Sequence, residues 1–150
     1  MSYNLYDLNR QGLPKLLDHV ETKEQWQEKR RRIEEIWLET MGGLPEKVPV
    51  SYRIRSEKKE ADHTRIHLTY KTVFEDEVTA YLLVPNDLDG AEKLPAVMAL
   101  HPTNEQGKDS VATPQGKVNR MYGLELVSRG YVVLAPDALT SGERIYDGLQ

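Results

Sequence analysis

The fold is decided by the apolar run Pro95-Ala-Val-Met-Ala-Leu100 and by the polar segment His101-Pro-Thr-Asn-Glu-Gln-Gly-Lys108 that follows it. Asn119 to Gly130 then has the pattern of a helix, and a second apolar run, Tyr131-Val-Val-Leu-Ala135, ends at Pro136-Asp137. Neither run alternates polar and apolar residues, which is typical of parallel strands covered by helices on both faces. This stretch therefore predicts a βαβ unit with a right-handed crossover.

Both predicted strands end in polar segments, and ligands of open α/β sheets bind beyond the carboxyl ends of the strands. We therefore expect a functional site at His101 to Lys108 and at Asp137 to Arg144. His101 is interpreted as a structural histidine whose ring holds the loop by hydrogen bonds, with a direct catalytic role as the alternative. Asp137 is interpreted as a loop cap, with pairing to a base as the alternative.

The N-terminal part of the chain predicts a helix. Thr22 and Gln25 have the spacing of a capping box, and Gly42-Gly43 followed by Pro45 ends the helical pattern. The apolar residues of this helix share one stripe, which favours docking on another element: Trp26, Ile33, Ile36, Trp37 and Met41. Residues 1–45 are therefore predicted to form an N-terminal helical extension.

Between the helix and the βαβ unit, the pattern changes to alternation of apolar and polar residues. It predicts strands over Val48 to Arg55, Arg65 to Lys71 and Val78 to Val84. Such alternation favours antiparallel pairing with one solvated face, so the whole chain predicts a mixed sheet of about five strands. His63, in the first turn, and His67, on the polar face of the second strand, are expected to be solvated.

Composition excludes several classes of function. The chain has 150 residues, a net charge of −4 and no cysteine. The charge gives no reason to expect nucleic-acid binding, and the lack of cysteine excludes disulfides, thiolate metal sites and a cysteine nucleophile. No segment has the pattern of a signal peptide or of a membrane span, so a cytoplasmic protein without a membrane partner is expected.

No cofactor or metal site is predicted. Gly116-Lys117 does not complete a phosphate-binding loop, because Val111 stands where the first glycine belongs and Val118 stands where Ser or Thr belongs. No G-x-G-x-x-G motif follows the first apolar run, and no group of histidines or carboxylates has metal-ligand spacing in a supporting context.

Several segments resemble a known family when they are taken in order: Leu94-Pro-Ala-Val-Met-Ala-Leu-His-Pro-Thr103, Gly107-Lys108, Leu126-Val-Ser-Arg-Gly-Tyr131 and Val132-Val-Leu-Ala-Pro-Asp137. Together they resemble the N-terminal half of the α/β-hydrolase superfamily, in particular its dienelactone-hydrolase-like and acetyl-xylan-esterase-like members. The resemblance implies an α/β fold class in which residues 46–150 form the first half of an α/β-hydrolase domain. In it, an antiparallel meander leads into a βαβ unit and the sheet is incomplete.

The resemblance also implies a role for the loop after the first apolar run. In this family, one of the two backbone N–H groups that hold the oxyanion comes from that loop. Pro102 has no N–H, so the donor would be Thr103 or Asn104, with Thr103 as the expected catalytic group. His101, Asn104 and Asp137 would then support the loop.

The nucleophile motif G-x-S-x-G is absent from the 150 residues. The resemblance places the Ser, the acid and the His beyond Gln150, so we expect a truncated hydrolase that is inactive alone and whose complete form acts on a small-molecule ester. It also leaves Ala96 to Leu100 as an open sheet edge, where self-association is expected. The alternatives are a non-catalytic interaction module that uses this edge and an unrelated small α/β domain that binds a ligand at His101 to Lys108.

Overall fold

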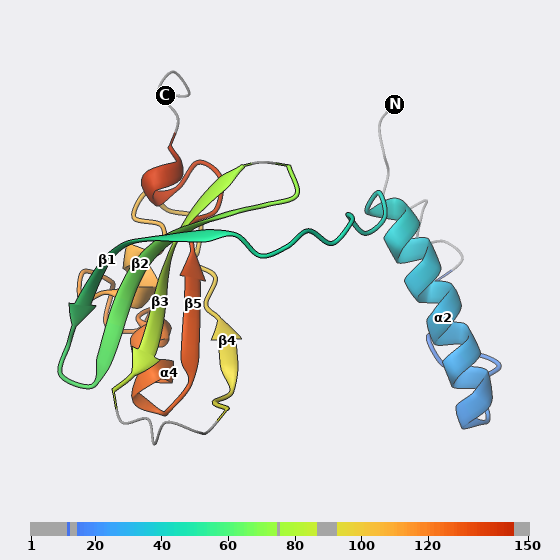
Figure 1. Ribbon diagram of the computed structural model, residues 1–150. Helices are drawn as coiled ribbons and strands as arrows, with labels where there is room; N and C mark the ends of the chain where they lie inside the picture. Colours follow the sequence, from blue (N-terminus) through green and yellow to red (C-terminus); the bar gives the residue numbers. More distant parts are fainter. Residues whose placement is uncertain (1–11, 13–14, 75, 87–92, 146–150) are drawn as a thin grey trace. The chain divides into compact units, whose positions relative to one another are not determined.

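The computed structural model describes residue 12 and residues 15–74, 76–86 and 93–145, and Figure 1 shows the course of the chain. The chain divides into two compact units, Met1–Pro45 and Glu46–Gln150. Among the described residues, the first unit contains one long helix, and the second contains the sheet and the shorter helices. Each unit is described by itself.

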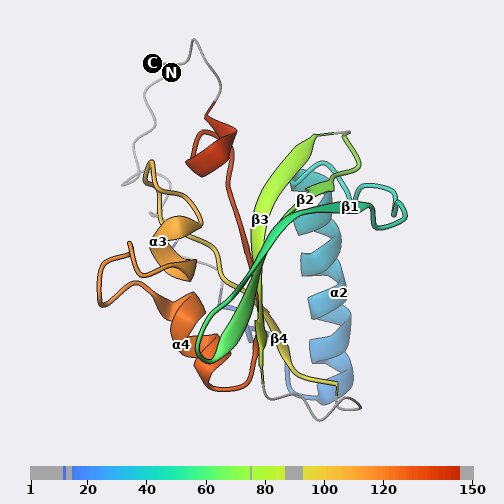
Figure 2. The ribbon, with the colours of Figure 1, turned by 60° about the vertical axis from the view of Figure 1, so that its left-hand side comes forward.

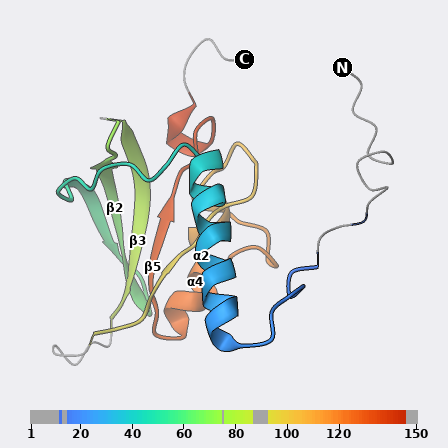
Figure 3. The ribbon, with the colours of Figure 1, turned by 90° about the vertical axis from the view of Figure 1, so that its right-hand side faces the viewer.

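The predicted N-terminal helix is present as α2, Lys23–Thr40, which Figure 3 shows as one unbroken helix. Thr22 caps it as expected: the Thr22 side chain accepts a hydrogen bond from the backbone N–H of Gln25, and the Gln25 side chain accepts one from the N–H of Thr22. The helix ends before Gly42 and Gly43, which both have positive φ angles. No residue of α2 is buried: Trp26 of its apolar stripe is half-buried, and Ile33, Ile36 and Trp37 are exposed.

The second unit is built on a five-stranded mixed sheet in the order β1-β2-β3-β5-β4. Its strands are β1 (Tyr52–Lys59), β2 (His63–Lys71), β3 (Glu77–Pro85), β4 (Ala96–Met98) and β5 (Val132–Pro136). The β1, β2 and β3 strands form an antiparallel meander, β3 pairs antiparallel with β5, and β4 pairs parallel with β5. The predicted meander and βαβ unit are therefore confirmed, although β1 begins at Tyr52 and not at Val48, and continues to Lys59.

The crossover between β4 and β5 contains two short helices, α3 (Asp109–Ala112) and α4 (Tyr122–Ser128), which lie on the same face of the sheet in Figure 2. The predicted helix from Asn119 to Gly130 is therefore shorter than expected. A turn closed by the N–H of Arg120 on the carbonyl of Lys117 precedes α4, and Gly130 ends the helical segment with a φ angle of +89°. The α3 helix was not predicted.

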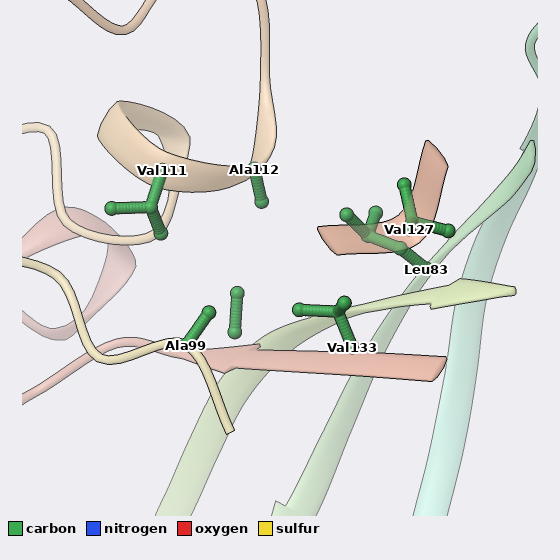
Figure 4. Close-up of a cluster of buried hydrophobic side chains, with 7 residues drawn as sticks. Leu83, Ala99, Val111, Ala112, Val127 and Val133 are labelled. Atoms are coloured by element: carbon green, nitrogen blue, oxygen red, sulfur yellow. The ribbon is translucent and has the colours of Figure 1, made fainter. Parts of the chain in front are cut away.

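The core lies between these helices and the sheet. Val111 and Ala112 of α3 and Val127 of α4 are close to the strand residues Leu83 and Val133, as Figure 4 shows. All five are at most 2% exposed, and Ala99 and Ala135 complete the cluster. This packing anchors the end of β4, and therefore the loop that leaves it, to the helical layer.

The other face of the sheet is also apolar. Side chains alternate between the two faces along each strand, so Leu82 and Leu134 point away from the core side. Its side chains line a groove of about 510 Å³ that runs across all the strands: Val50, Tyr52, Ile54, Ile66, Leu68, Tyr70, Leu82, Met98 and Leu134. We call this groove the open face. Tyr52 is 63% exposed and Met98 is 57% exposed, so these side chains are accessible to solvent.

Candidate functional site

The polar loops at the carboxyl ends of β4 and β5 meet around the carboxylate of Asp137, which is 1% exposed. Its Oδ1 accepts a hydrogen bond from the backbone N–H of Lys108 at 2.8 Å. Its Oδ2 accepts hydrogen bonds from the Thr79 hydroxyl at 2.6 Å and from the backbone N–H of Glu143 at 3.2 Å. The loop after β4, the strand β3 and the segment after β5 are therefore tied to one buried side chain.

Lys108 completes this arrangement with its side chain. Its Nζ lies 2.5 Å from Asp137 Oδ2 and 2.6 Å from Glu143 Oε1, and the Lys108 side chain is fully buried. Nζ also lies 4.9 Å from the centre of the Tyr81 ring, within the range of a cation–π contact. A buried ammonium group is tolerated here because two carboxylates share its charge.

These contacts shift the pKa values of the group. Burial raises the pKa of Asp137, but the hydrogen bonds from Lys108 and Thr79 and the charge of Lys108 outweigh it and hold that pKa below its ordinary value. Burial lowers the pKa of Lys108, but its hydrogen bonds to Asp137 and Glu143 raise it above the ordinary value. Both groups are therefore charged at neutral pH and form a structural ion pair rather than a proton donor and acceptor.

Glu143 belongs to the short 3-10 helix η1, Gly142–Arg144, which brings further charges to the group. His67 Nε2 of β2 lies 2.9 Å from Glu143 Oε1, and Arg55 Nη1 of β1 lies 3.4 Å from Glu143 Oε2. Arg144 is 8% exposed and donates a hydrogen bond to the backbone carbonyl of Asp137 at 3.0 Å. The segment after β5 thus covers the polar side of the meander.

The expected solvation of the two strand histidines is therefore wrong. His63 is 5% exposed, and its Nδ1 lies 2.7 Å from Asp62 Oδ1. His67 retains only 20% side-chain exposure beside Glu143. His67 is covered because Glu143, 76 positions further along the chain, folds back over it, and local alternation carries no sign of that contact.

The loop after β4 begins with His101, whose ring contacts two backbone groups. The N–H of Ala138 donates a hydrogen bond to His101 Nε2 at 2.9 Å, and His101 Nδ1 lies 2.7 Å from the carbonyl oxygen of Pro102. Further along, the N–H of Gly142 donates a hydrogen bond to the carbonyl of Glu105 at 3.0 Å. The loop is therefore attached to the segment after β5 at its start, in its middle and, through Lys108, at its end.

Thr103 and Asn104 lie between these attachments. Thr103 is exposed, and within the described part of the chain its backbone N–H donates no hydrogen bond. Asn104 Oδ1 accepts a hydrogen bond from the N–H of Gly107 at 2.8 Å, which closes the turn. The arrangement thus presents an available backbone donor on a loop that is held from several sides.

Sequence reasoning singled out His101, Thr103, Asn104 and Asp137, and the structure places all of them in this pair of loops. Lys108 and Glu143 lie inside the two segments where a site was expected, but the ion pairs of Lys108 with Asp137 and Glu143 were not predicted. The available signal was that charges of opposite sign follow two strands that were predicted to be neighbours. Over the described ranges, no group of metal-ligating side chains is found, and no helix there combines the length and the apolar character that crossing a membrane requires.

Comparisons with known proteins bear on the fold. No family model matches the sequence, and no curated protein matches it. The structure is similar to that of a candidate acetyl xylan esterase from Bacteroides fragilis, with a TM-score of 0.75 and 14% identity over 95% of this chain and 38% of that one. It is also similar to a glucuronoyl esterase from Solibacter usitatus, with a TM-score of 0.54 and 18% identity over 93% of this chain and 41% of that one.

The chain thus spans less than half the length of these neighbours. At such low identity the likeness shows a shared fold. The fold class predicted from the sequence, an α/β sheet that forms an incomplete α/β-hydrolase fold, is confirmed, and the two solved structures named above carry the names of esterases.

Proposed function

We propose that this chain is the N-terminal part of a serine hydrolase that cleaves a carboxylic ester, and that it supplies one donor of the oxyanion hole. The observation that carries the proposal is the available N–H of Thr103, on a firmly attached loop at the end of β4 in an esterase-like sheet. In this proposal, residues 1–45 are a helical extension, and residues 46–150 are the first half of the hydrolase domain.

The chemistry assigned to this loop is electrostatic. When a serine hydroxyl adds to an ester carbonyl, the carbonyl oxygen becomes an oxyanion, and backbone N–H groups that are already directed at it lower the barrier. A loop attached to the segment after β5 at several points needs little reorganisation to provide such a donor. The 150 residues contain no nucleophile elbow. In this proposal, the serine and its base therefore belong to a part of the polypeptide that this sequence does not contain.

A fluorophosphonate probe, which reacts covalently with activated serines, tests this proposal. The native protein is captured from its source cells with antibodies against residues 46–150 and treated with the probe. We expect an intact mass above the 17.2 kDa of this chain and a single labelled serine outside its 150 residues. A native protein of 17.2 kDa that no probe labels would overturn the proposal.

Two variants of the native polypeptide test the assigned donor. Thr103→Pro removes the N–H, and we expect kcat for ester hydrolysis to fall by about a hundredfold or more. Thr103→Ala keeps the N–H and removes only the side chain, so its kcat should stay close to that of the native protein. Equal losses in the two variants would show that the backbone donor is not the important group.

A second candidate function is a non-catalytic interaction module, and the position of β4 favours it. Within the described residues, β4 is the last strand of the sheet, and its only strand partner there is β5. Met98 and Leu100 are 57% and 62% exposed at this edge, and an apolar open edge invites pairing with a strand of another copy.

Sedimentation of the purified 150-residue chain separates the two candidates. A module that pairs through β4 should form dimers that Met98→Lys abolishes, because a lysine on an edge strand opposes pairing. Val118→Lys is the matched control, since Val118 is 93% exposed in the loop between α3 and α4. A monomer at all concentrations would exclude this second function.

A further inference from the structure

The ring of His101 lies between two backbone groups that can each play only one part in a hydrogen bond. The N–H of Ala138 can only donate, so Nε2, at 2.9 Å, must be the unprotonated nitrogen. The carbonyl of Pro102 can only accept, so Nδ1, at 2.7 Å, must carry the proton. The two contacts therefore select the neutral Nδ1–H tautomer.

The carbonyl that the ring holds belongs to the same peptide unit as the N–H of Thr103. The atoms of a peptide unit lie in one plane, and in the trans form the C=O and the N–H point in opposite directions. None of the described peptide bonds is cis. Fixing the direction of the Pro102 carbonyl therefore fixes the direction of the Thr103 N–H, which points away from the ring.

The other end of the bridge is rigid. Ala138 follows Asp137, whose carboxylate is held by Thr79 and Lys108, and whose own N–H donates to the carbonyl of Thr79 at 2.9 Å. The ring thus links the segment at the end of β5 to a single peptide unit in the loop after β4, and holds that peptide unit in place.

We infer that His101 is a positioning residue whose Nδ1–H tautomer, held by the N–H of Ala138, sets the direction of the Thr103 N–H. The inference rests on the proposed function, because the direction of this N–H matters for catalysis only if it binds an oxyanion. It assigns His101 no proton transfer, since both of its ring nitrogens are engaged with the backbone.

The first test is an NMR measurement on the ¹⁵N-labelled native polypeptide. A hydrogen bond between two nitrogens carries a scalar coupling, so the amide nitrogen of Ala138 should couple to His101 Nε2. The ring should show a protonated Nδ1 and an unprotonated Nε2. A missing coupling, or a proton on Nε2 at neutral pH, would overturn the inference without any variant having to fold.

Two variants then separate the contacts. In His101→Asn, the side-chain amide nitrogen can take the place of Nδ1, but the side chain cannot reach Ala138. In His101→Gln, the side-chain amide oxygen can take the place of Nε2, but the side chain offers no donor at the Nδ1 position. Because the bridge needs both contacts, the residual dipolar coupling of the Thr103 N–H should change in both variants. His19→Gln is the control, since the His19 side chain is 93% exposed in the other unit. An unchanged Thr103 coupling in both variants would overturn the inference.

Kinetics of the native polypeptide link this geometry to the reaction. Both His101 variants should lower kcat by at least tenfold and change KM by less than threefold, because the donor acts on the transition state more than on the bound ester. Unchanged kcat in a protein that the serine probe still labels would overturn the role of His101 alone. A native protein that the probe does not label would overturn the proposed function itself.

Discussion

The Asp137 carboxylate leaves no room for a side chain at the two glycines beside it. A Cβ added to Gly142 or to Gly107 would lie 2.2 Å from Asp137 Oδ1, and both glycines have positive φ angles. We expect Gly142→Ala to lower the free energy of unfolding by about 1–2 kcal/mol for the backbone conformation and roughly 1–3 kcal/mol more for the overlap. Urea unfolding measures this loss.

Gly130→Ala provides the matched control for this measurement. Gly130 also has a positive φ angle, +89°, but nothing lies within 4 Å of an added Cβ. Only the conformational cost of about 1–2 kcal/mol should appear there. Equal losses at Gly130 and Gly142 would show that the region around Asp137 relaxes freely.

The same carboxylate predicts how stability depends on pH. Since the pKa of Asp137 is held below its ordinary value of 3.8, its ionised form stabilises the folded state. This contribution is fully present above the ordinary value and is lost as the pH falls through the lowered pKa of the folded state. Unfolding by urea at pH values from 7 downward should show the loss.

Asp137→Asn identifies the group behind that pH dependence. It leaves the buried ammonium of Lys108 with Glu143 as its remaining partner, so we expect a loss of about 3 kcal/mol at neutral pH. The acid-dependent loss of stability should be smaller in this variant than in the native chain. The same acid dependence in both proteins would assign it to other carboxylates.

At the scale of an element, no residue of α2 is buried within its own unit, and the capping box holds its first turn. An isolated helix of this kind is marginal in water, so its cap has a visible effect. Thr22→Ala removes the capping hydroxyl and should destabilise the first turn by about 1 kcal/mol. Hydrogen exchange of the backbone amides of α2 measures the change.

Thr40→Ala, at the other end of α2, is the control variant for Thr22→Ala. The Thr40 hydroxyl donates to the carbonyl of Ile36 at 2.7 Å, a bond within the helix that slightly disfavours a straight helical geometry. Its removal should therefore leave exchange in the first turn unchanged. If both variants accelerate exchange there equally, the capping box is not what holds the start of the helix.

At the scale of the whole molecule, the described part of residues 46–150 covers one face of its own sheet with helices and leaves the other without one. One face carries α3 and α4 over the core, and the open face is a groove of about 510 Å³ lined by apolar side chains. We expect an apolar fluorescent dye to bind the folded chain there, and Ile66→Asp to weaken that binding at least fivefold. Val118→Asp, at an exposed position outside the groove, should leave it unchanged.

Prediction from the sequence succeeded where a pattern is local. The apolar runs before His101 and Asp137 gave β4 and β5, and the capping box at Thr22 gave the start of α2. It failed for α3, because four residues are too few to show a helical period. Two contacts join distant parts of the chain: that of Lys108 with Glu143 and that of Glu143 with His67. Local sequence spacing could therefore not predict them.

The burial of Lys108 has a consequence for chemical modification. Acylating reagents and enzymes attack a lysine only when its amine is accessible and has lost its proton, and Lys108 is fully buried with a raised pKa. The amine of Lys117, nine positions further along, is on an exposed side chain, so reagents can reach it. Acylation of Lys108 therefore requires a local opening in which the segment around Glu143 moves away and exposes the Lys108 amine.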